Sequence, residues 1–251
     1  MNAPRLTAII LTYNESRHIA DCIETVRFAD EVIIFDSGST DDTPAIARER
    51  GATVLQRPFD DYAGQRNAAM AHVTDGWVLF VDADERVTPA LAAEIQKSLT
   101  GAAAGYRIPR HNYIFGKLTR GAGWYPDYQT RLLRVGRAHY DPAKKVHEVV
   151  VLDGPLGTLS QPLTHYNYDH PDQFKAKQQR YVAYDAKILY EAGVRPHAYT
   201  PISQAIRHFW WRYVALGGWR DGWHGLRLSA WMAWYEYRKY RLLQQDWRDT
   251  R

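Results

Sequence analysis

The stretch that most restricts the fold of this chain runs from Trp77 to Arg86 and reads Trp-Val-Leu-Phe-Val-Asp-Ala-Asp-Glu-Arg. Its five leading apolar residues indicate a strand that is buried on both faces of a mostly parallel sheet. Three carboxylates follow at once, on Asp82, Asp84 and Glu85. Ligands of open α/β sheets bind beyond the carboxyl ends of the strands, and hard cations such as Mg²⁺ and Mn²⁺ prefer carboxylate oxygens. An isolated Asp-x-Asp is more often a solvated turn, so the rest of the chain has to distinguish a metal site from a turn.

Strand and helix patterns alternate before Asp82. The apolar, β-rich segments that we expect to form strands are Leu6–Thr12, Glu31–Phe35, Thr53–Gln56 and Trp77–Val81. Three helical patterns lie between them. The first covers 19–26, the second is capped by Asp41 or Asp42 and reaches Arg50, and the third covers 64–71. This order predicts the α/β class, with a right-handed, mostly parallel sheet. The first strand–helix turn lacks Gly-x-Gly-x-x-Gly, which argues against a dinucleotide-binding domain.

The pattern changes after the carboxylate-rich stretch. Thr88 and Pro89 predict the cap and first turn of another helix. Short strands and loops are expected from Gly105 to about His165. A helix returns at Gln173–Glu191, where Phe174, Tyr181 and Ile188 recur at heptad spacing.

Composition and termini exclude several other classes of protein. The chain has 251 residues, of which 45% are hydrophobic, and this is enough for a sizeable core. Cys22 is the single cysteine, so no internal disulfide can form, and its place on an apolar helix face indicates a core residue. The N-terminus has no signal-peptide pattern, and no run reaches the roughly 18–20 apolar residues of a membrane span. We therefore expect a cytoplasmic protein.

Six motifs occur in a fixed order along the chain. They are 12–15 (Thr-Tyr-Asn-Glu), 36–41 (Asp-Ser-Gly-Ser-Thr-Asp), Gly64 with Arg66-Asn67, 82–86 (Asp-Ala-Asp-Glu-Arg), 124–129 (Trp-Tyr-Pro-Asp-Tyr-Gln) and 146–148 (Val-His-Glu). In this order they resemble glycosyltransferase family 2, and the last two resemble its lipopolysaccharide core-biosynthesis glucosyltransferase branch. The resemblance covers roughly residues 5–240. It implies a GT-A-type, Rossmann-like sheet flanked by helices, and inverting transfer of a sugar from a nucleotide donor.

The same resemblance leads to a division of the chain and a donor site. We expect a glycosyltransferase domain at 1–172, with a donor half to about residue 100 and an acceptor half at about 101–172, followed by a helical appendage at 173–251. Carboxylates at adjacent strand ends can accept hydrogen bonds from a base and a ribose, and a guanidinium suits a diphosphate. A turn-forming role stays open for Asp36, and an exposed helical position for Arg66. The implied donor-binding residues are Tyr13, Asn14, Glu15, Asp36, Arg66, Asp82, Gln129 and Arg131.

A divalent cation, Mg²⁺ or Mn²⁺, is implied at Asp82 and Asp84, where it would bridge the donor phosphates and neutralise the leaving diphosphate. His147 is a further candidate ligand or a diphosphate contact, and a plain structural role for it stays open.

An inverting transfer needs one general base for the acceptor hydroxyl and no covalent nucleophile. Asp127 is expected to be this base, because it precedes Gln129 and Arg131 in a motif that resembles the base motif of the family. Glu148 is the competing candidate.

Residues 206–241 combine aromatic and cationic side chains without a run of membrane-spanning length. The tryptophans are Trp210, Trp211, Trp219, Trp223, Trp231 and Trp234, and the cations are Arg207, Arg212, Arg220, Arg227, Arg238, Lys239 and Arg241. This mixture favours a surface in the membrane interface. A helix pair that packs on the catalytic domain is the alternative, and a nucleic-acid surface is disfavoured because no upstream segment resembles a nucleic-acid module.

Two classes of function remain for the chain. The leading hypothesis is a metal-dependent transferase that moves a hexose, from UDP-glucose above all, to a membrane-linked glycan or lipid such as lipopolysaccharide core, on the inner face of the cytoplasmic membrane. A polyprenyl-phosphate or peptide glycosyltransferase is an alternative within the enzyme class. The second class is a non-catalytic nucleotide-sugar-binding protein, which Asp127 argues against because binding needs no base.

Overall fold

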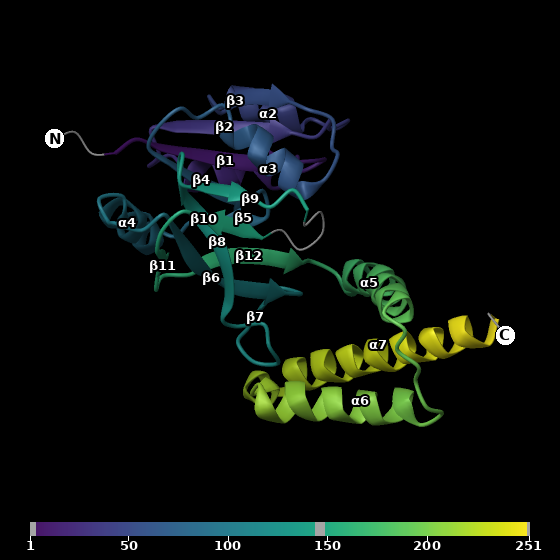
Figure 1. Ribbon diagram of the computed structural model, residues 1–251. Coiled ribbons are helices and arrows are strands. Elements are labelled where there is room, and N and C mark those ends of the chain that lie inside the picture. Colours follow the sequence, from purple (N-terminus) through teal and green to yellow (C-terminus); the bar gives the residue numbers. More distant parts are fainter. Residues whose placement is uncertain (1–3, 144–148, 250–251) are drawn as a thin grey trace. The chain divides into compact units, whose positions relative to one another are not determined.

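The computed structural model describes residues 4–143 and 149–249 (Figure 1). Strands and helices alternate through the first half of the chain, as the sequence pattern predicts. The strands are β1 (Leu6–Thr12), β2 (Glu31–Asp36), β3 (Thr53–Gln56), β4 (Trp77–Asp82), β5 (Glu85–Arg86), β6 (Gly105–Ile114), β7 (Lys117–Thr119), β8 (Asp127–Arg134), β9 (Ala138–Tyr140), β10 (Val150–Leu152), β11 (Leu156–Thr158) and β12 (Leu163–Tyr168). The helices are α1 (Ile19–Thr25), α2 (Thr43–Glu49), α3 (Tyr62–Met70), α4 (Pro89–Ser98), α5 (Pro171–Glu191), α6 (Thr200–Trp210) and α7 (Gly222–Asp249).

The large sheet has the strand order β3-β2-β1-β4-β8-β6-β12-β5, and β7 and β11 pair with β6. Its first four strands are parallel, whereas β8 lies antiparallel to β4. Strands β9 and β10 form a separate antiparallel pair. The α/β class expected from the sequence is confirmed.

The apolar run of β4 is buried on both faces of the sheet. Leu79 and Val81 belong to one hydrophobic cluster, and Val78 and Phe80 belong to another. Alternate side chains of a strand point to opposite faces, so each cluster occupies one face. The double-sided burial that the sequence predicts is confirmed.

Register brings the polar ends of three strands to one edge of the sheet. Thr12 of β1 is paired with Asp36 of β2, and Leu11 of β1 with Asp82 of β4. Because these strands are parallel, their carboxyl ends share the edge at which open α/β sheets bind ligands.

Caps explain where the helices begin. Thr88 accepts a hydrogen bond of 3.2 Å from the Leu91 backbone N–H, as expected for the start of α4. Asp61 accepts one of 2.7 Å from the Gly64 N–H, and α3 therefore begins at Tyr62, earlier than the sequence pattern predicts.

The described residues form two compact units. Unit 1 contains residues 4–110 and 128–165, and unit 2 contains residues 111–127 and 166–249, within the described ranges. Strands β6, β8 and β12 contribute residues to both units. The expected domain boundary at residue 172 stays a prediction.

Unit 2 has its own hydrophobic core. The buried members are Ile114, Tyr168, Phe174, Leu228 and Tyr235. Helices α6 and α7 run side by side (Figure 1), joined by a π-helical turn (Trp211–Ala215) and a 3₁₀ turn (Gly218–Asp221). Of the three heptad-spaced residues of α5, Phe174 is buried, whereas Tyr181 and Ile188 are exposed. Helix α5 therefore contributes to this core mainly through its first turns.

Candidate active site

Two arginines hold the Asp82 carboxylate at the end of β4. Arg66 of α3 donates from Nη2 to Oδ1 over 3.1 Å, and Arg131 of β8 donates to both carboxylate oxygens, with 3.3 Å from Nη1 to Oδ1. Burial raises the pKa of Asp82, but the guanidinium groups of Arg131 and Arg66 outweigh it and hold this pKa well below its usual range. Asp82 is therefore charged at neutral pH.

Arg131 also joins Asp82 to the fully buried Glu85. Its Nη2 lies 3.2 Å from Oε1 of Glu85, and Arg110 reaches the same oxygen at 3.1 Å. The other oxygen of Glu85 accepts the backbone N–H of Asp82 at 3.0 Å. Two carboxylates and the guanidinium groups of three arginines thus form one network, in which each buried charge has a partner of opposite sign.

Asp84 stands apart from the arginine network. Its Oδ2 lies 3.3 Å from Nε2 of His165 on β12, and its side chain is 32% exposed. Strand pairing explains this contact, because His165 is in register with Glu85, the residue after Asp84.

Glu15 follows β1 and adds another carboxylate to the electrostatic environment of Asp82 and Asp84. Burial, then the negative charges of Asp84, Asp41 and Asp82, raise the pKa of Glu15 to about 7. Glu15 is thus poised to take up or release a proton near neutral pH when the charge beside it changes.

Asp36 organises the loop that follows β2. Its buried carboxylate accepts hydrogen bonds from Thr12 Oγ1 at 3.0 Å, from the Ser39 N–H at 2.9 Å and from the Gly38 N–H at 3.1 Å. Asn14, with a positive φ of 57°, accepts the Thr40 N–H at 2.8 Å through Oδ1. These bonds correspond to the turn-forming alternative for Asp36, and its role toward a donor stays a prediction.

Three further donor-site candidates are Tyr13, Gln129 and Arg66. Tyr13 is 60% exposed at the end of β1, and Gln129 lies on β8 two positions before Arg131. Arg66 is buried, with its guanidinium 5.0 Å from the centre of the Phe80 ring, so the exposed-arginine alternative is wrong.

The residues at the lip of β4 fit a divalent cation. Within the described ranges, no group of three or more His, Cys, Asp or Glu side chains is arranged to enclose a metal. A Mg²⁺ or Mn²⁺ ion that also binds substrate phosphates needs only one or two protein carboxylates. Asp82 and Asp84, both 32% exposed, provide that set. His147 lies outside the described residues.

In unit 2, Asp127 begins β8 and its carboxylate is held by an amide. Oδ2 of Asp127 accepts a hydrogen bond of 3.2 Å from Nδ2 of Asn112, which is fully buried. Glu148, the competing candidate for the base, lies outside the described residues. The choice between the two therefore stays a prediction.

Several residues of these networks were not in the set expected from the sequence: Glu85, Arg110, Asn112 and His165. Glu85 was visible as the third carboxylate of the run after β4. His165 lies two positions after the buried Leu163 on β12, and Asn112 lies two positions before the buried Ile114 on β6, so each shares a strand face with a buried apolar residue. A polar residue at an inward position of a strand is the signal that could have identified both.

The family of the chain follows from comparison with known proteins. The family model for glycosyl transferase family 2 matches residues 7–147, the part of the chain that contains β1–β4, the Asp82 network and Asp127. The chain belongs to this family. It is therefore a glycosyltransferase, and the fold is of the expected GT-A type.

The chain is similar over most of its length to known and uncharacterized glycosyltransferases. The chain is 31% identical over 233 residues to the lipopolysaccharide core biosynthesis glycosyltransferase LpsC of Rhizobium meliloti, covering 88% of this chain and 84% of LpsC. It is 29% identical to an uncharacterized glycosyltransferase of Rickettsia felis, covering 84% and 78%. A solved structure, glucosyl-3-phosphoglycerate synthase of Mycobacterium tuberculosis with Mn²⁺, UDP-glucose and phosphoglyceric acid, matches with 23% identity and a TM-score of 0.37. That match spans 43% of this chain and 44%, less than half, of the mycobacterial one.

The C-terminal tryptophans of this glycosyltransferase are mostly exposed. Trp231 packs against the core of unit 2, whereas Trp210, Trp211, Trp219, Trp223 and Trp234 are between 45% and 78% exposed. Of these six tryptophans, Trp231 is thus the one that packs in a hydrophobic core, and the packing of the helix pair on the catalytic domain stays a prediction. Among the described helices, none has the combination of length and apolar content that crossing a membrane requires.

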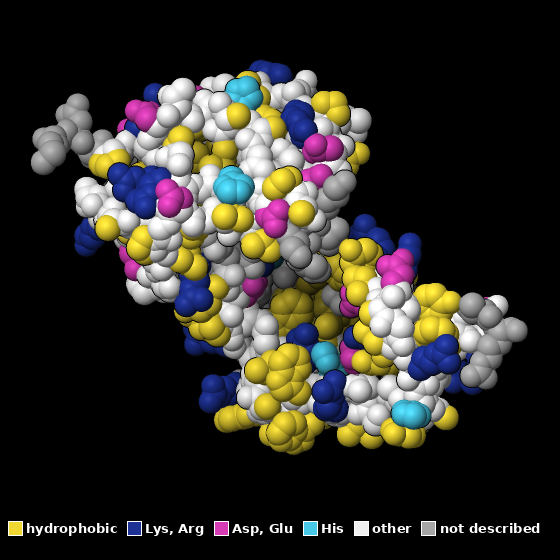
Figure 2. Space-filling model, in the orientation of Figure 1, with side chains coloured by type: hydrophobic (Ala, Val, Ile, Leu, Met, Phe, Trp, Pro, Cys, Tyr) yellow, Lys and Arg dark blue, Asp and Glu magenta, His cyan; other side chains and the backbone are white. Residues whose placement is uncertain are grey.

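One face of α6 continues this aromatic surface. The exposed apolar residues on this side, here called the α6 face, are Tyr199 at the N-cap and Ile202, Ile206 and Trp210 within the helix. They recur three or four positions apart, so they project from one side of the helix. Figure 2 shows hydrophobic side chains over the region of α6, with Lys and Arg side chains beside them.

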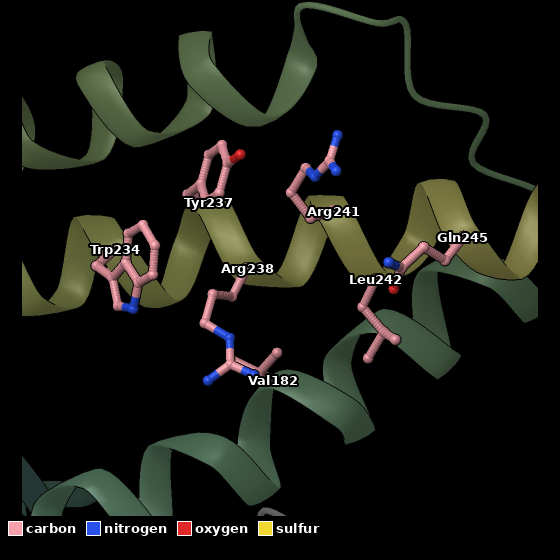
Figure 3. Close-up of a pocket in the computed structure, with 7 residues that line it drawn as sticks. All are labelled: Val182, Trp234, Tyr237, Arg238, Arg241, Leu242 and Gln245. Carbon is pink, nitrogen blue, oxygen red and sulfur yellow. The ribbon is translucent and has the colours of Figure 1, made fainter.

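A cavity of about 280 Å³ lies along α7, lined by Val182, Trp234, Tyr237, Arg238, Arg241, Leu242 and Gln245. Figure 3 shows Arg238 pointing toward Val182 of α5, whereas Arg241 points to the other side of α7. The two guanidinium groups therefore do not converge on one anion.

Proposed function

We propose that this glycosyltransferase is an inverting, metal-dependent hexosyltransferase that uses a nucleotide-sugar donor, UDP-glucose first among them, and a membrane-linked glycan acceptor of the lipopolysaccharide-core type. The observation that carries the proposal is the Asp82–Asp84 pair at the carboxyl end of β4, beside Glu15 and the loop after β2. Similarity to LpsC over most of both chains supports the class of acceptor.

The chain's own residues prepare the donor site. Arg66 and Arg131 keep Asp82 charged and fixed, while Asp84 contacts the imidazole of His165 and has solvent access. A divalent cation bound at these carboxylates together with the diphosphate would neutralise the charge that develops on the leaving group. Asn14, Glu15 and Asp36 stand at the strand ends where a nucleoside would be bound.

The transfer itself needs one proton acceptor. In the proposed reaction the acceptor hydroxyl attacks the anomeric carbon, Asp127 takes its proton, and the bond from that carbon to the diphosphate oxygen breaks. The products are the glycoside with inverted configuration, the nucleoside diphosphate and a protonated Asp127. No covalent enzyme intermediate forms.

A membrane surface is the proposed partner of the C-terminal helices. The α6 face and the exposed tryptophans suit the headgroup region of a bilayer, where tryptophan rings are favoured. The cations among them, Arg207 and Arg220 for example, are exposed and would each gain on the order of 1 kcal/mol near an anionic leaflet. We therefore place the enzyme on the inner face of the cytoplasmic membrane, where a lipid-linked acceptor is held in the same plane.

A donor screen tests the proposed reaction. The purified chain is incubated with UDP-glucose, UDP-galactose, UDP-N-acetylglucosamine or GDP-mannose, with Mn²⁺, Mg²⁺ or EDTA, in the presence and absence of deacylated lipopolysaccharide core. We expect release of UDP from a UDP-hexose that depends on both metal and acceptor. Turnover that EDTA leaves unchanged would contradict the metal requirement, and consumption of no nucleotide sugar would contradict the donor class.

A further inference from the structure

The loop that leads to Asp127 is held by the turn between α6 and α7, all within unit 2. Asp221 of this turn accepts the backbone N–H of Gly121 at 2.7 Å and that of Arg120 at 3.1 Å, both through Oδ2. One carboxylate thus accepts two consecutive backbone N–H groups, and charge-assisted bonds of this kind are stronger than bonds between neutral groups.

The next loop residue, Ala122, is held from both sides. Its N–H donates to the Leu216 carbonyl at 3.0 Å, and its carbonyl accepts a hydrogen bond of 2.6 Å from Nη1 of Arg212. Ala122 is fully buried with a positive φ of 54°, a conformation that is uncommon for alanine and that the surrounding contacts must maintain.

Backbone contact between loop and turn is as close as the chain permits. A Cβ atom built on Gly121 would lie 2.2 Å from the Gly217 carbonyl oxygen. Any side chain at Gly121 would therefore separate the two segments, and glycine is required there.

The loop then passes through Trp124 to Asp127, and Asn112 links the two. Nδ2 of Asn112 donates to the Trp124 carbonyl at 2.8 Å and to Oδ2 of Asp127 at 3.2 Å. Nδ2 of Asn167 in turn donates to Oδ1 of Asn112 at 3.3 Å. The ring of Trp124 packs against Tyr168 and Phe174 of the unit 2 core.

We propose that Asn112 and Asp221 are positioning residues for the transfer reaction: Asp221 fixes the loop of residues 120–126 on the C-terminal helices, and Asn112 orients the carboxylate of Asp127. This inference rests on the proposed role of Asp127 as the base. The C-terminal helices then have a part in catalysis besides any contact with a membrane. Because a displacement of about 1 Å can cost roughly 100-fold in rate, both contacts affect turnover more than donor binding.

Kinetics of matched variants test the proposal. Asp221→Ala, Asp221→Asn and Asn112→Ala are compared with Asp249→Asn, which removes an exposed carboxylate at the far end of α7. The assay follows UDP release from UDP-glucose with Mn²⁺ and deacylated lipopolysaccharide core, and calorimetry gives the affinity for UDP with Mn²⁺. We expect kcat to fall at least tenfold for Asp221→Ala and Asn112→Ala, at unchanged affinity for UDP. Asp221→Asn keeps an acceptor oxygen and should have a kcat between those of Asp221→Ala and the unaltered protein. Asp249→Asn should leave kcat unchanged.

A second measurement does not depend on turnover. Hydrogen–deuterium exchange of the peptide covering 120–126 should accelerate in Asp221→Ala, while exchange in α4 stays as in the unaltered protein. Equal exchange of this peptide, or equal kcat of the folded Asp221→Ala and Asn112→Ala variants, overturns the inference. Asp127→Asn distinguishes a failure of the proposed base from a failure of the positioning inference. If Asp127→Asn keeps full turnover, the assignment of the base is wrong. If Asp127→Asn is inactive while the Asn112 and Asp221 variants keep full turnover, the positioning inference alone is wrong.

Discussion

His165 lies against Asp84, with 3.3 Å between Nε2 of the imidazole and Oδ2 of the carboxylate. The residue that follows Asp84, Glu85, is locked into the arginine network through its buried side chain. Asp84 is thus fixed by its neighbour and by one imidazole while it keeps solvent access. A carboxylate in this situation can give oxygen ligands to a cation without breaking an ion pair with arginine.

Asp84→Asn should abolish metal-dependent donor binding, because the amide keeps the shape of the side chain but removes the charge that a hard cation requires. We expect calorimetry to show the same weak affinity for UDP with and without Mn²⁺. Asp75→Asn, an exposed aspartate before β4, serves as the control and should keep the metal effect. If the metal dependence of Asp84→Asn equals that of the control, Asp84 is not a ligand.

Arg131→Met should destabilise the fold by about 1.5–3 kcal/mol, because the buried Glu85 and Asp82 each lose a charged hydrogen-bond partner while Arg110 and Arg66 remain. Urea unfolding followed by circular dichroism measures the change. Arg48→Met, on the exposed side of α2, removes the same charge from the surface and should stay within about 0.5 kcal/mol of the unaltered protein. Equal midpoints for the two variants would show that the network contributes little.

Glu15 should make the protein less stable as pH rises. Its pKa is raised to about 7 from 4.5, so between these values the unfolded chain is ionised while the folded one still holds the proton, and unfolding is favoured. The effect is absent below about pH 4.5 and complete above about pH 7. Glu15→Gln removes this effect. Between pH 5 and pH 8 the unaltered protein should therefore lose on the order of 1–2 kcal/mol more free energy of unfolding than the Glu15→Gln variant. Urea unfolding at both pH values, with Glu49→Gln as an exposed control, measures the difference; a pH-independent effect of Glu15→Gln would contradict the raised pKa.

Asp127→Asn should lower kcat by roughly 100-fold or more, the range for loss of a general base, at unchanged affinity for UDP. Glu148→Gln is the comparison that decides between the two candidates. An inactive Glu148→Gln beside an active Asp127→Asn would transfer the assignment to Glu148.

The elements of the sheet could be predicted because their signals are local. The apolar run of β4 and the Thr88 cap of α4 depend on neighbours in sequence, and both were located correctly. The turn chemistry of Asp61 was missed, so the start of α3 was predicted too late. Apolar spacing predicts where a helix is favoured, whereas a cap decides where it begins.

The partners within the site could not be predicted, because they depend on pairing between distant strands. His165 reaches Asp84 only because β12 pairs with β5, and Arg131 reaches Asp82 because β8 lies antiparallel to β4. The spacing of residues along the chain does not predict either pairing. The carboxylates themselves were recognisable, since three of them directly follow a buried strand.

The membrane contact of the α6 face is the last prediction. Ile206 and Trp210 are 65% and 58% exposed on this face, and burying an apolar side chain contributes about 1.5–3 kcal/mol. The double variant Ile206→Glu/Trp210→Glu should therefore lower the fraction that floats with phosphatidylglycerol-containing liposomes at least tenfold, without loss of folding. Gln179→Glu/Ala183→Glu, at two exposed positions of α5, adds the same two negative charges as a control and should float like the unaltered chain. Liposomes of phosphatidylcholine alone should bind the chain more weakly, because the cations of the C-terminal helices then have no anionic partner. Equal flotation of the double variant and the control, or no flotation of the unaltered chain, would show that the α6 face serves another partner.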